Sequence, residues 1–234
     1  MLGIDLLTAG ALLTLVGNTI EIKCDMAPTT KINVIPTTEP IKYDMSRSVT
    51  QIQGGKSGTV NPHSFGGVSV TQGFMEGSIS MRPTVKMGYA TYKKLNLGCV
   101  WYEQIDIKMN ITPRIVIGKE VAADKCMKPA VLEHELKHVK VDRQVVNKYS
   151  AIMGKKVHDE IAKRGFVAGP IPVEQMQSTV ARMQETVGQI VELEYRKMDI
   201  ERTELQRGVD SLEEYNRVQA TCPDFNPLAK TRQR

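Results

Sequence analysis

The segment His134-Glu135-Leu136-Lys137-His138 is the one strong chemical pattern in the chain. Residues four positions apart lie one turn apart on the same face of a helix, so two imidazoles at this spacing can bind one metal ion. The Glu beside the first His can take a proton from a metal-bound water, which then attacks a carbonyl carbon. We therefore expect His134 and His138 to bind Zn2+ and Glu135 to act as general base and acid.

The residues around this motif bear on whether it is a metal site. Apolar residues at helical spacing predict that the helix packs against a core: Val131, Leu132, Leu136 and Val139. Lys137 and Lys140 are charged where helices of zinc proteases usually carry uncharged groups. The alternative interpretation is a pair of surface histidines on an amphipathic helix.

A third metal ligand is not evident beside the motif. Glu160 lies in the downstream window in which a thermolysin-like site has its Glu ligand. If residues 130–164 form one helix, however, Glu160 lies roughly 30 Å from the metal, at 1.5 Å rise per residue. Asp142 shares the face of the two histidines but would have to lean back by one turn.

The second long helix offers a better source of this ligand. If the two helices form an antiparallel hairpin centred near Ala168, residues 198–202 face the motif. Asp199 or Glu201 can then supply a carboxylate, and we expect Asp199 to be the third metal ligand, with Arg202 close to the site. The alternative is that Asp199, Glu201 and Arg202 are solvated charges on the helix.

Hydrophobic periodicity predicts the elements that must position these residues. Alternating apolar residues predict strands over Val85–Tyr92, Cys99–Tyr102, Ile105–Met109 and Arg114–Ile117, with turns at Asn96, Gly98 and Pro113. Helical spacing predicts one helix from Pro129 to just before Gly165 and another from about Val173 to Val218. The expected fold class is α+β: a small antiparallel sheet, then a long antiparallel helical hairpin with a zincin-like HExxH motif on its first helix.

The composition suggests four regions. Residues 1–45 hold an apolar, possible export segment and short strands, and residues 46–80 form a flexible linker rich in Gly, Ser and Thr. Residues 81–222 form the metallopeptidase-like domain, and residues 223–234 form a basic tail.

Charge and length exclude several classes of protein. The chain has 234 residues, a formal net charge of +5 and only 5% aromatic residues, which argues against a nucleic-acid partner. It contains no run of 18 apolar residues, so we expect no integral membrane domain.

The N-terminus and the cysteines point to an oxidising compartment. Residues 6–16 are apolar and too short to span a bilayer, but they suit the hydrophobic part of a secretion signal. The alternative is a buried strand or the start of a helix. The four cysteines form no CxxC pair, which favours one or two disulfides of open connectivity over a metal site: Cys24, Cys99, Cys126 and Cys222. Four buried thiols are the alternative, and we expect a secreted or periplasmic bacterial protein.

The chain from about Val85 to Val218 resembles a bacterial family of predicted secreted zinc-dependent proteases, catalogued as a domain of unknown function. The resemblance lies in the order of Cys99-Val-Trp-Tyr102, Ile111-Thr-Pro-Arg-Ile-Val-Ile117 and Leu132-Glu-His-Glu-Leu-Lys-His138, and loosely in Asp199, Thr203, Gln206 and Gly208. The family's histidine before the glycine is missing here. The resemblance implies zinc and a peptidase activity, carried by His134, Glu135 and His138.

Two functions from different classes remain in view. The first is a zinc-dependent peptidase that hydrolyses peptide bonds of a peptide or protein substrate through a metal-activated water. The second is a non-catalytic helical-hairpin interaction or envelope-structural protein. The apolar seam Val173–Ile190 has coiled-coil spacing and makes a homo-oligomer through the C-terminal helix possible. A zinc-binding protein without catalysis is a third possibility.

Overall fold

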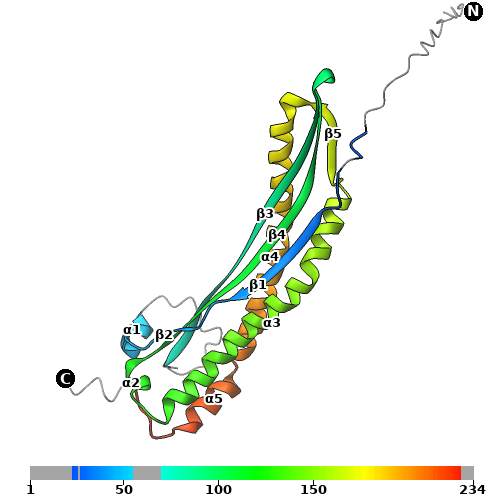
Figure 1. The fold of residues 1–234 in the computed structure, drawn as a ribbon. Helices are drawn as coiled ribbons and strands as arrows, with labels where there is room; N and C mark the ends of the chain where they lie inside the picture. The colour runs from blue at the N-terminus through cyan, green and yellow to red at the C-terminus, as the bar shows by residue number, and fades with distance from the viewer. Residues whose placement is uncertain (1–22, 26, 55–69, 228–234) are drawn as a thin grey trace, which may run out of the picture.

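A computed structural model describes residues 23–25, 27–54 and 70–227. The apolar export segment at residues 6–16 and the end of the basic tail lie outside these described residues. Figure 1 shows an elongated molecule in which a long, narrow sheet lies alongside two long helices.

The sheet is built around one strand, β4 (Leu97–Ile117). β3 (Gly73–Tyr92) runs antiparallel to β4 along almost its whole length. The other edge of β4 is shared by three shorter strands: β1 (Lys31–Thr38) and β2 (Lys42–Asp44) pair with it in parallel, and β5 (Val167–Pro172) pairs antiparallel with its first residues. The sheet is therefore mixed, and about 65–70 Å long at 3.3–3.4 Å per residue.

Each of the two long strands, β3 and β4, contains a proline at a position where it breaks no pairing. Pro113 lies between the residues of β4 that pair with β1, ending at Ile111, and those that pair with β2, beginning at Arg114. Pro83 is in β3, which is an edge strand. Edge positions and gaps in the ladder tolerate a residue without an N–H group. Pro113 and Gly98, which the sequence suggested as breaks, both lie inside β4. The turn between β3 and β4 is formed by Lys93–Leu95 and Asn96, whose φ is positive at 51°.

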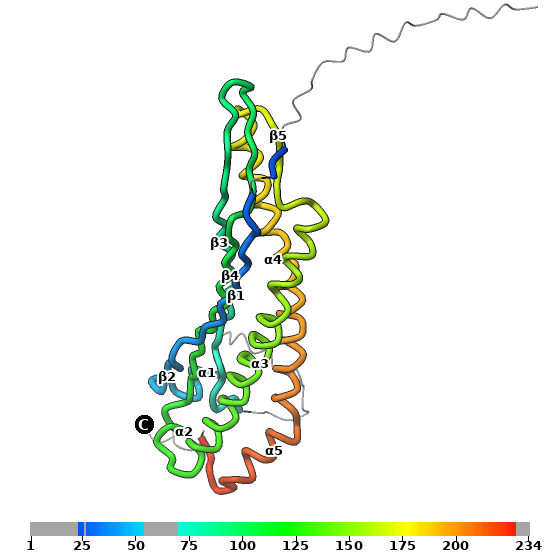
Figure 2. Tube along the Cα trace, turned by 45° about the vertical axis from the view of Figure 1, so that its right-hand side comes forward, coloured from blue at the N-terminus to red at the C-terminus, as the bar shows by residue number. Residues whose placement is uncertain are grey.

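The helices cover one face of the sheet. α3 (Met127–Ala162) and α4 (Met176–Val209) run in opposite directions along it, and Figure 2 shows both on the same side of the strands. Alternate residues of β4 point into the core against α3 and α4 (Ile105, Ile107, Met109 and Ile111). The intervening polar residues, such as Asp106 and Lys108, leave the opposite face solvated, which is common in sheets covered on one side.

The fold-class prediction is wrong. The expected fold was a small antiparallel sheet followed by a helical hairpin, but the five-stranded sheet is mixed and two of its strands run parallel to β4. The two long helices do not form a simple hairpin, because β5 lies between them and belongs to the sheet.

Three further details differ from the expected elements. The region 46–80 contains regular structure, namely the short helix α1 (Val49–Gly54) and the start of β3. The predicted helix over Val173–Val218 is instead α4 and a separate α5 (Leu212–Thr221), with a break at Asp210 and Ser211. A further short helix, α2 (Lys119–Ala122), precedes α3.

The predicted coiled-coil seam is largely used within the chain. Val187, Ile190 and Val191 are buried in the main core, and Met183 packs against it. These side chains pack against the sheet and α3 of the same chain.

The four cysteines are paired in two disulfides. Cys24 bonds to Cys99, which joins the segment before β1 to β4, and Cys126 bonds to Cys222, which joins the start of α3 to the end of α5. Among the described residues, no helix has the length and apolar character needed to cross a bilayer.

Candidate metal centre

α3 brings the three motif residues to one place. His134, Glu135 and His138 lie within the first half of this helix, and their ligand atoms lie within 4.8 Å of one another. Val131 and Val139 anchor this part of α3 in a second core cluster, which fixes the orientation of the helix. Glu135 and His138 are buried, while His134 retains partial exposure.

Both imidazole rings face a carboxylate that the sequence did not predict. The Nε2 atom of His134 lies 3.3 Å from Oδ1 of Asp210, and the Nε2 atom of His138 lies 3.1 Å from the same oxygen. Asp210 lies in the short break between α4 and α5 and is itself buried. Three candidate ligand atoms from two distant parts of the chain therefore converge.

Two of the separations between these atoms match the edge of a tetrahedron around one metal ion. Zinc binds imidazole nitrogen and carboxylate oxygen at about 2.0–2.2 Å, so two ligand atoms of one tetrahedral ion lie about 3.3–3.5 Å apart. The two Nε2–Oδ1 distances of 3.3 and 3.1 Å are close to this edge length. Two imidazoles and one carboxylate are also a usual set of protein ligands for catalytic zinc, which leaves a fourth position for water.

The hydrogen bonds of Gln206 fix the proton on His138. The side-chain nitrogen of Gln206 donates to two acceptors, the backbone oxygen of His138 at 3.1 Å and Oδ1 of Asp142 at 2.7 Å. Its amide oxygen must therefore face Nδ1 of His138, which it accepts from. With the proton held on Nδ1, the Nε2 lone pair of a neutral His138 ring is available to a metal ion.

A matching contact holds His134. Its Nδ1 lies 3.3 Å from Oε1 of Glu214 on α5. Glu214 is ionised, because hydrogen bonds from Arg217 and Lys137 hold its pKa at about 2. A carboxylate can only accept here, so Nδ1 of His134 donates, and its Nε2 is the ring nitrogen that points at Asp210.

A buried ion pair supports the Gln206 contact from behind. Asp142 is 0% exposed and accepts from Arg202 through Nε at 2.7 Å and through Nη2 at 3.1 Å. Arg202 also donates to the backbone oxygen of Gly77 in β3 at 3.1 Å. The Asp142 carboxylate is thus fully occupied by Arg202 and Gln206, which sets the position of the Gln206 amide.

Glu135 lies beside the two histidines, and one of its carboxyl oxygens has no hydrogen-bond partner among the described residues. Its side chain is buried, one oxygen accepts the Met75 backbone N–H, and Oε2 has no hydrogen-bond partner among the described residues. Burial raises the pKa of Glu135 to about 7, although the nearby His134 and His138 oppose the rise. A buried carboxyl oxygen without a partner calls for a partner absent from the protein itself, such as a water molecule.

The contacts between Asp210 and the two histidines change the pKa values of Asp210 and His138. Burial opposes ionisation of Asp210, but its hydrogen bonds with His134 and His138 outweigh burial, and its pKa lies well below the usual range. Burial lowers the pKa of His138, but the contacts with Asp210 and Glu135 outweigh burial and leave that pKa raised. The site is therefore electronegative and stabilises positive charge, whether a proton or a metal ion.

The four carboxylates weighed from the sequence occupy other positions. The side chain of Asp199, the expected third ligand, is 50% exposed and lies 3.8 Å from Arg202. Glu201 binds Lys148, and Glu160 binds Lys163 and Arg164 on the surface. Asp142 lies next to the site but binds Arg202 and Gln206.

The error in the predicted ligand has two physical causes. First, the connection between α3 and α4 includes β5, which is paired with β4. As a result, Asp142 on α3 faces Arg202 on α4, a shift of about two helical turns from the pairing expected for a hairpin centred at Ala168. In addition, α4 ends at Val209 and a new helix starts after Ser211, whose side chain accepts from the Glu214 backbone N–H and caps α5. The sequence Ser211-Leu-Glu-Glu214 matches a capping box, and this signal could have located the break and its Asp.

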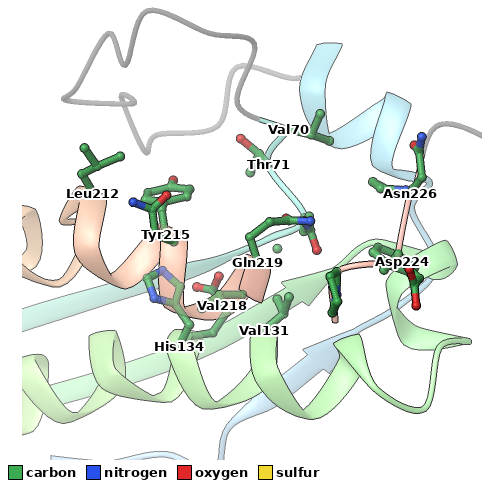
Figure 3. A pocket seen from close by; sticks show the side chains of 17 residues that line it. Val70, Thr71, Val131, His134, Leu212, Tyr215, Val218, Gln219, Asp224 and Asn226 are labelled. Atoms are coloured by element: carbon green, nitrogen blue, oxygen red, sulfur yellow. The ribbon is translucent and has the colours of Figure 1, made fainter. Parts of the chain in front are cut away.

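A cavity of about 690 Å³ opens beside the cluster and is lined by His134 and Glu135. Figure 3 shows it between α3, α5 and the segment leading into β3, with Tyr215 on α5 close to His134. The predicted catalytic carboxylate and one imidazole are therefore accessible from a cavity large enough for part of a substrate.

Comparisons of the chain with protein-family models, curated proteins and solved structures find no match. The resemblance to secreted zinc-dependent proteases therefore stays a prediction, and the case for a function rests on the geometry of the site.

Proposed function

We propose that this protein is a zinc-dependent peptidase. The observation that carries the proposal is the convergence of the Nε2 atoms of His134 and His138 on Asp210, with the buried and unpartnered Glu135 carboxyl beside them. Asp210 replaces Asp199 as the proposed third ligand. Zinc is favoured over Mg2+ or Ca2+ because two of the three ligands are imidazoles, which those hard cations seldom bind.

In the proposed reaction, three residues bind the metal and Glu135 transfers the proton. His134, His138 and Asp210 would hold the metal, which supplies Lewis acidity that makes water acidic near neutral pH and polarises a carbonyl group. Glu135 takes a proton from the water while the water oxygen forms a bond to the amide carbon. Glu135 then gives this proton to the amide nitrogen as the carbon–nitrogen bond breaks, which yields a carboxylic acid and an amine. A pKa near 7 suits a group that accepts and returns a proton at neutral pH.

The surroundings of β3 indicate how a substrate reaches this centre. Between Met75 and Ile79, three backbone groups on the outer edge of β3 contact side chains: Met75 contacts Glu135, Gly77 contacts Arg202 and Ile79 contacts Tyr195. An extended peptide that paired with this part of the edge would have to displace these three contacts. We therefore place the substrate in the cavity lined by His134 and Glu135 instead.

Two disulfides support an oxidising compartment. Such bonds persist in secreted and periplasmic proteins and are rare in the cytosol. We accordingly propose that the peptidase works outside the cytoplasm, on peptides or proteins present there.

The substitution Glu135→Gln tests the catalytic role. It removes the base and keeps the shape of the side chain, so we expect hydrolysis of a mixed peptide pool to fall by about 100-fold or more while zinc remains bound. The measurement is peptide hydrolysis by mass spectrometry, with bound zinc counted by elemental analysis on the same samples. A zinc-loaded protein that cleaves no peptide, or an unchanged rate in Glu135→Gln, would contradict the proposal and favour a zinc-binding protein without catalysis.

A further inference from the structure

The cavity beside the metal centre has a distinctive lining. Its middle part is apolar, with Val131 from α3 and Val218 from α5, and it carries an amide pair in which Nε2 of Gln72 donates to Oε1 of Gln219 at 3.2 Å. In Figure 3, His134 and Tyr215 lie on one side of Val131 and Gln219, and Asp224 and Asn226 lie on the other. The cavity thus leads from the candidate metal centre over an apolar stretch toward the Asp224 carboxylate.

The charges along this lining have one sign. Lys and Arg are missing from the described residues that line the cavity, whereas Glu135 and Asp224 contribute carboxylates. Asp224 is exposed, and the described part of the chain offers it no hydrogen bond or ion pair. An acidic substrate side chain would be repelled by Glu135 at one end of the cavity and by Asp224 at the other. A basic side chain could form an ion pair with Asp224, at the end remote from the metal centre.

We propose that this cavity binds a lysine or arginine side chain of the substrate, next to the peptide bond that is cut. The inference rests on the proposed peptidase function. The methylene groups of such a side chain would cover Val131 and Val218, and its cationic end would reach the Asp224 carboxylate. Lys and Arg commonly bury their apolar stem while the charged end remains near water, which matches an apolar wall with an exposed Asp at its end.

A comparison of two ligands tests this inference without relying on hydrolysis. Nα-acetyl-arginine amide and Nα-acetyl-citrulline amide have nearly the same shape, but only the first is charged. Their binding to the full chain can be followed by NMR through the methyl signals of Val131 and Val218. An exposed ion pair contributes little, so we expect the arginine ligand to bind about two- to fivefold more tightly.

The substitution Asp224→Asn should remove this preference, because it deletes the charge and keeps the shape. Glu204→Gln is the matched control: Glu204 is exposed on α4, lies outside the cavity lining and should leave the preference intact. High salt should also reduce the preference, because it screens exposed charges. Equal binding of the two ligands, failure of both to shift the Val131 and Val218 signals, or a preference that survives in Asp224→Asn would overturn the inference.

The same experiment separates this inference from the peptidase proposal. Peptide cleavage without discrimination between the two ligands would overturn the basic-residue pocket alone. Discrimination that depends on Asp224, in a zinc-loaded protein that cleaves no peptide, would overturn the peptidase proposal alone.

Discussion

The amide of Gln206 determines which nitrogen of His138 faces the candidate metal position. Its nitrogen is committed to the His138 backbone oxygen and to Asp142, so its oxygen is left for Nδ1 of His138. Asp142 is in turn held by Arg202 from α4. Arg202, Asp142 and Gln206 together orient the His138 imidazole. Arg202 and Gln206 lie on α4, whereas His138 lies on α3.

The substitution Gln206→Leu should weaken metal binding without removing a ligand. Loss of a group that orients a ligating histidine typically reduces metal affinity by about 10–100-fold, and we expect a decrease in this range. The measurement is zinc affinity by competition with a chelator, together with the His138 tautomer by nitrogen NMR in the metal-free protein. Gln177→Leu, at an exposed α4 position, serves as control. Unchanged zinc affinity and an unchanged Nδ1-protonated tautomer in Gln206→Leu would contradict this role.

At the scale of elements, α5 is held in place by polar contacts, by Val218 packed against the second core cluster, and by one covalent bond. None of its residues is classed as buried, yet Glu214 contacts His134 and Tyr215 lines the cavity. Its end is tied to the start of α3 by the Cys126–Cys222 disulfide. Asp210 is separated from this helix only by its capping residue Ser211, so the position of α5 also determines the position of the proposed third ligand.

Removal of this disulfide should loosen the metal site more than the core. In the double variant Cys126→Ser with Cys222→Ser, we expect faster amide hydrogen exchange in α5 and weaker zinc binding, with the exchange of buried α3 amides near Met153 nearly unchanged. The control is Cys24→Ser with Cys99→Ser, which removes the disulfide remote from α5. Exchange in α5 that stays slow after loss of Cys126–Cys222 would show that the polar contacts are sufficient.

The short strand β2 provides a pH-dependent contribution to stability. Hydrogen bonds from Ser46, together with Arg114 on β4, lower the pKa of Asp44 to about 2. The folded-state pKa lies below the value of about 3.9 expected for an unfolded chain, so this stabilisation is present above pH 4 and is lost as the pH falls toward 2.

The substitution Asp44→Asn should therefore destabilise the protein by about 1 kcal/mol at pH 7 and by much less near pH 2. Urea unfolding of both proteins at several pH values measures the difference. Glu204→Gln again serves as a control with no expected pH-dependent effect. A difference between Asp44→Asn and the unmodified chain that is constant from pH 7 to pH 2 would show that ionisation of Asp44 is not the cause.

At the scale of the whole molecule, local patterns predicted the first long helix and its motif well. The helix expected from Pro129 to just before Gly165 is α3, Met127–Ala162, because its apolar spacing and the terminal glycine are local signals. The HExxH spacing predicted the clustering of His134, Glu135 and His138 for the same reason.

The rest of the architecture depends on contacts between distant residues, which no local pattern reports. β1 pairs in parallel with β4 through residues such as Ile32 and Ile105, more than seventy positions apart. The break before α5 was missed because Val209 and Leu212 continue the apolar stripe across it. Asp210 consequently escaped notice, although the chain needs that break to bring its carboxylate to the histidines.

Zinc binding by two matched variants tests the central claim most directly. We predict that the unmodified chain and Asp199→Asn each bind one zinc ion per chain with equal affinity, and that Asp210→Asn binds it at least about tenfold more weakly, because Asp210 supplies a ligand oxygen. The measurement is calorimetric titration with elemental analysis of the dialysed proteins. Zinc affinity that is unchanged in Asp210→Asn, or an unmodified chain that binds no zinc, would contradict the account.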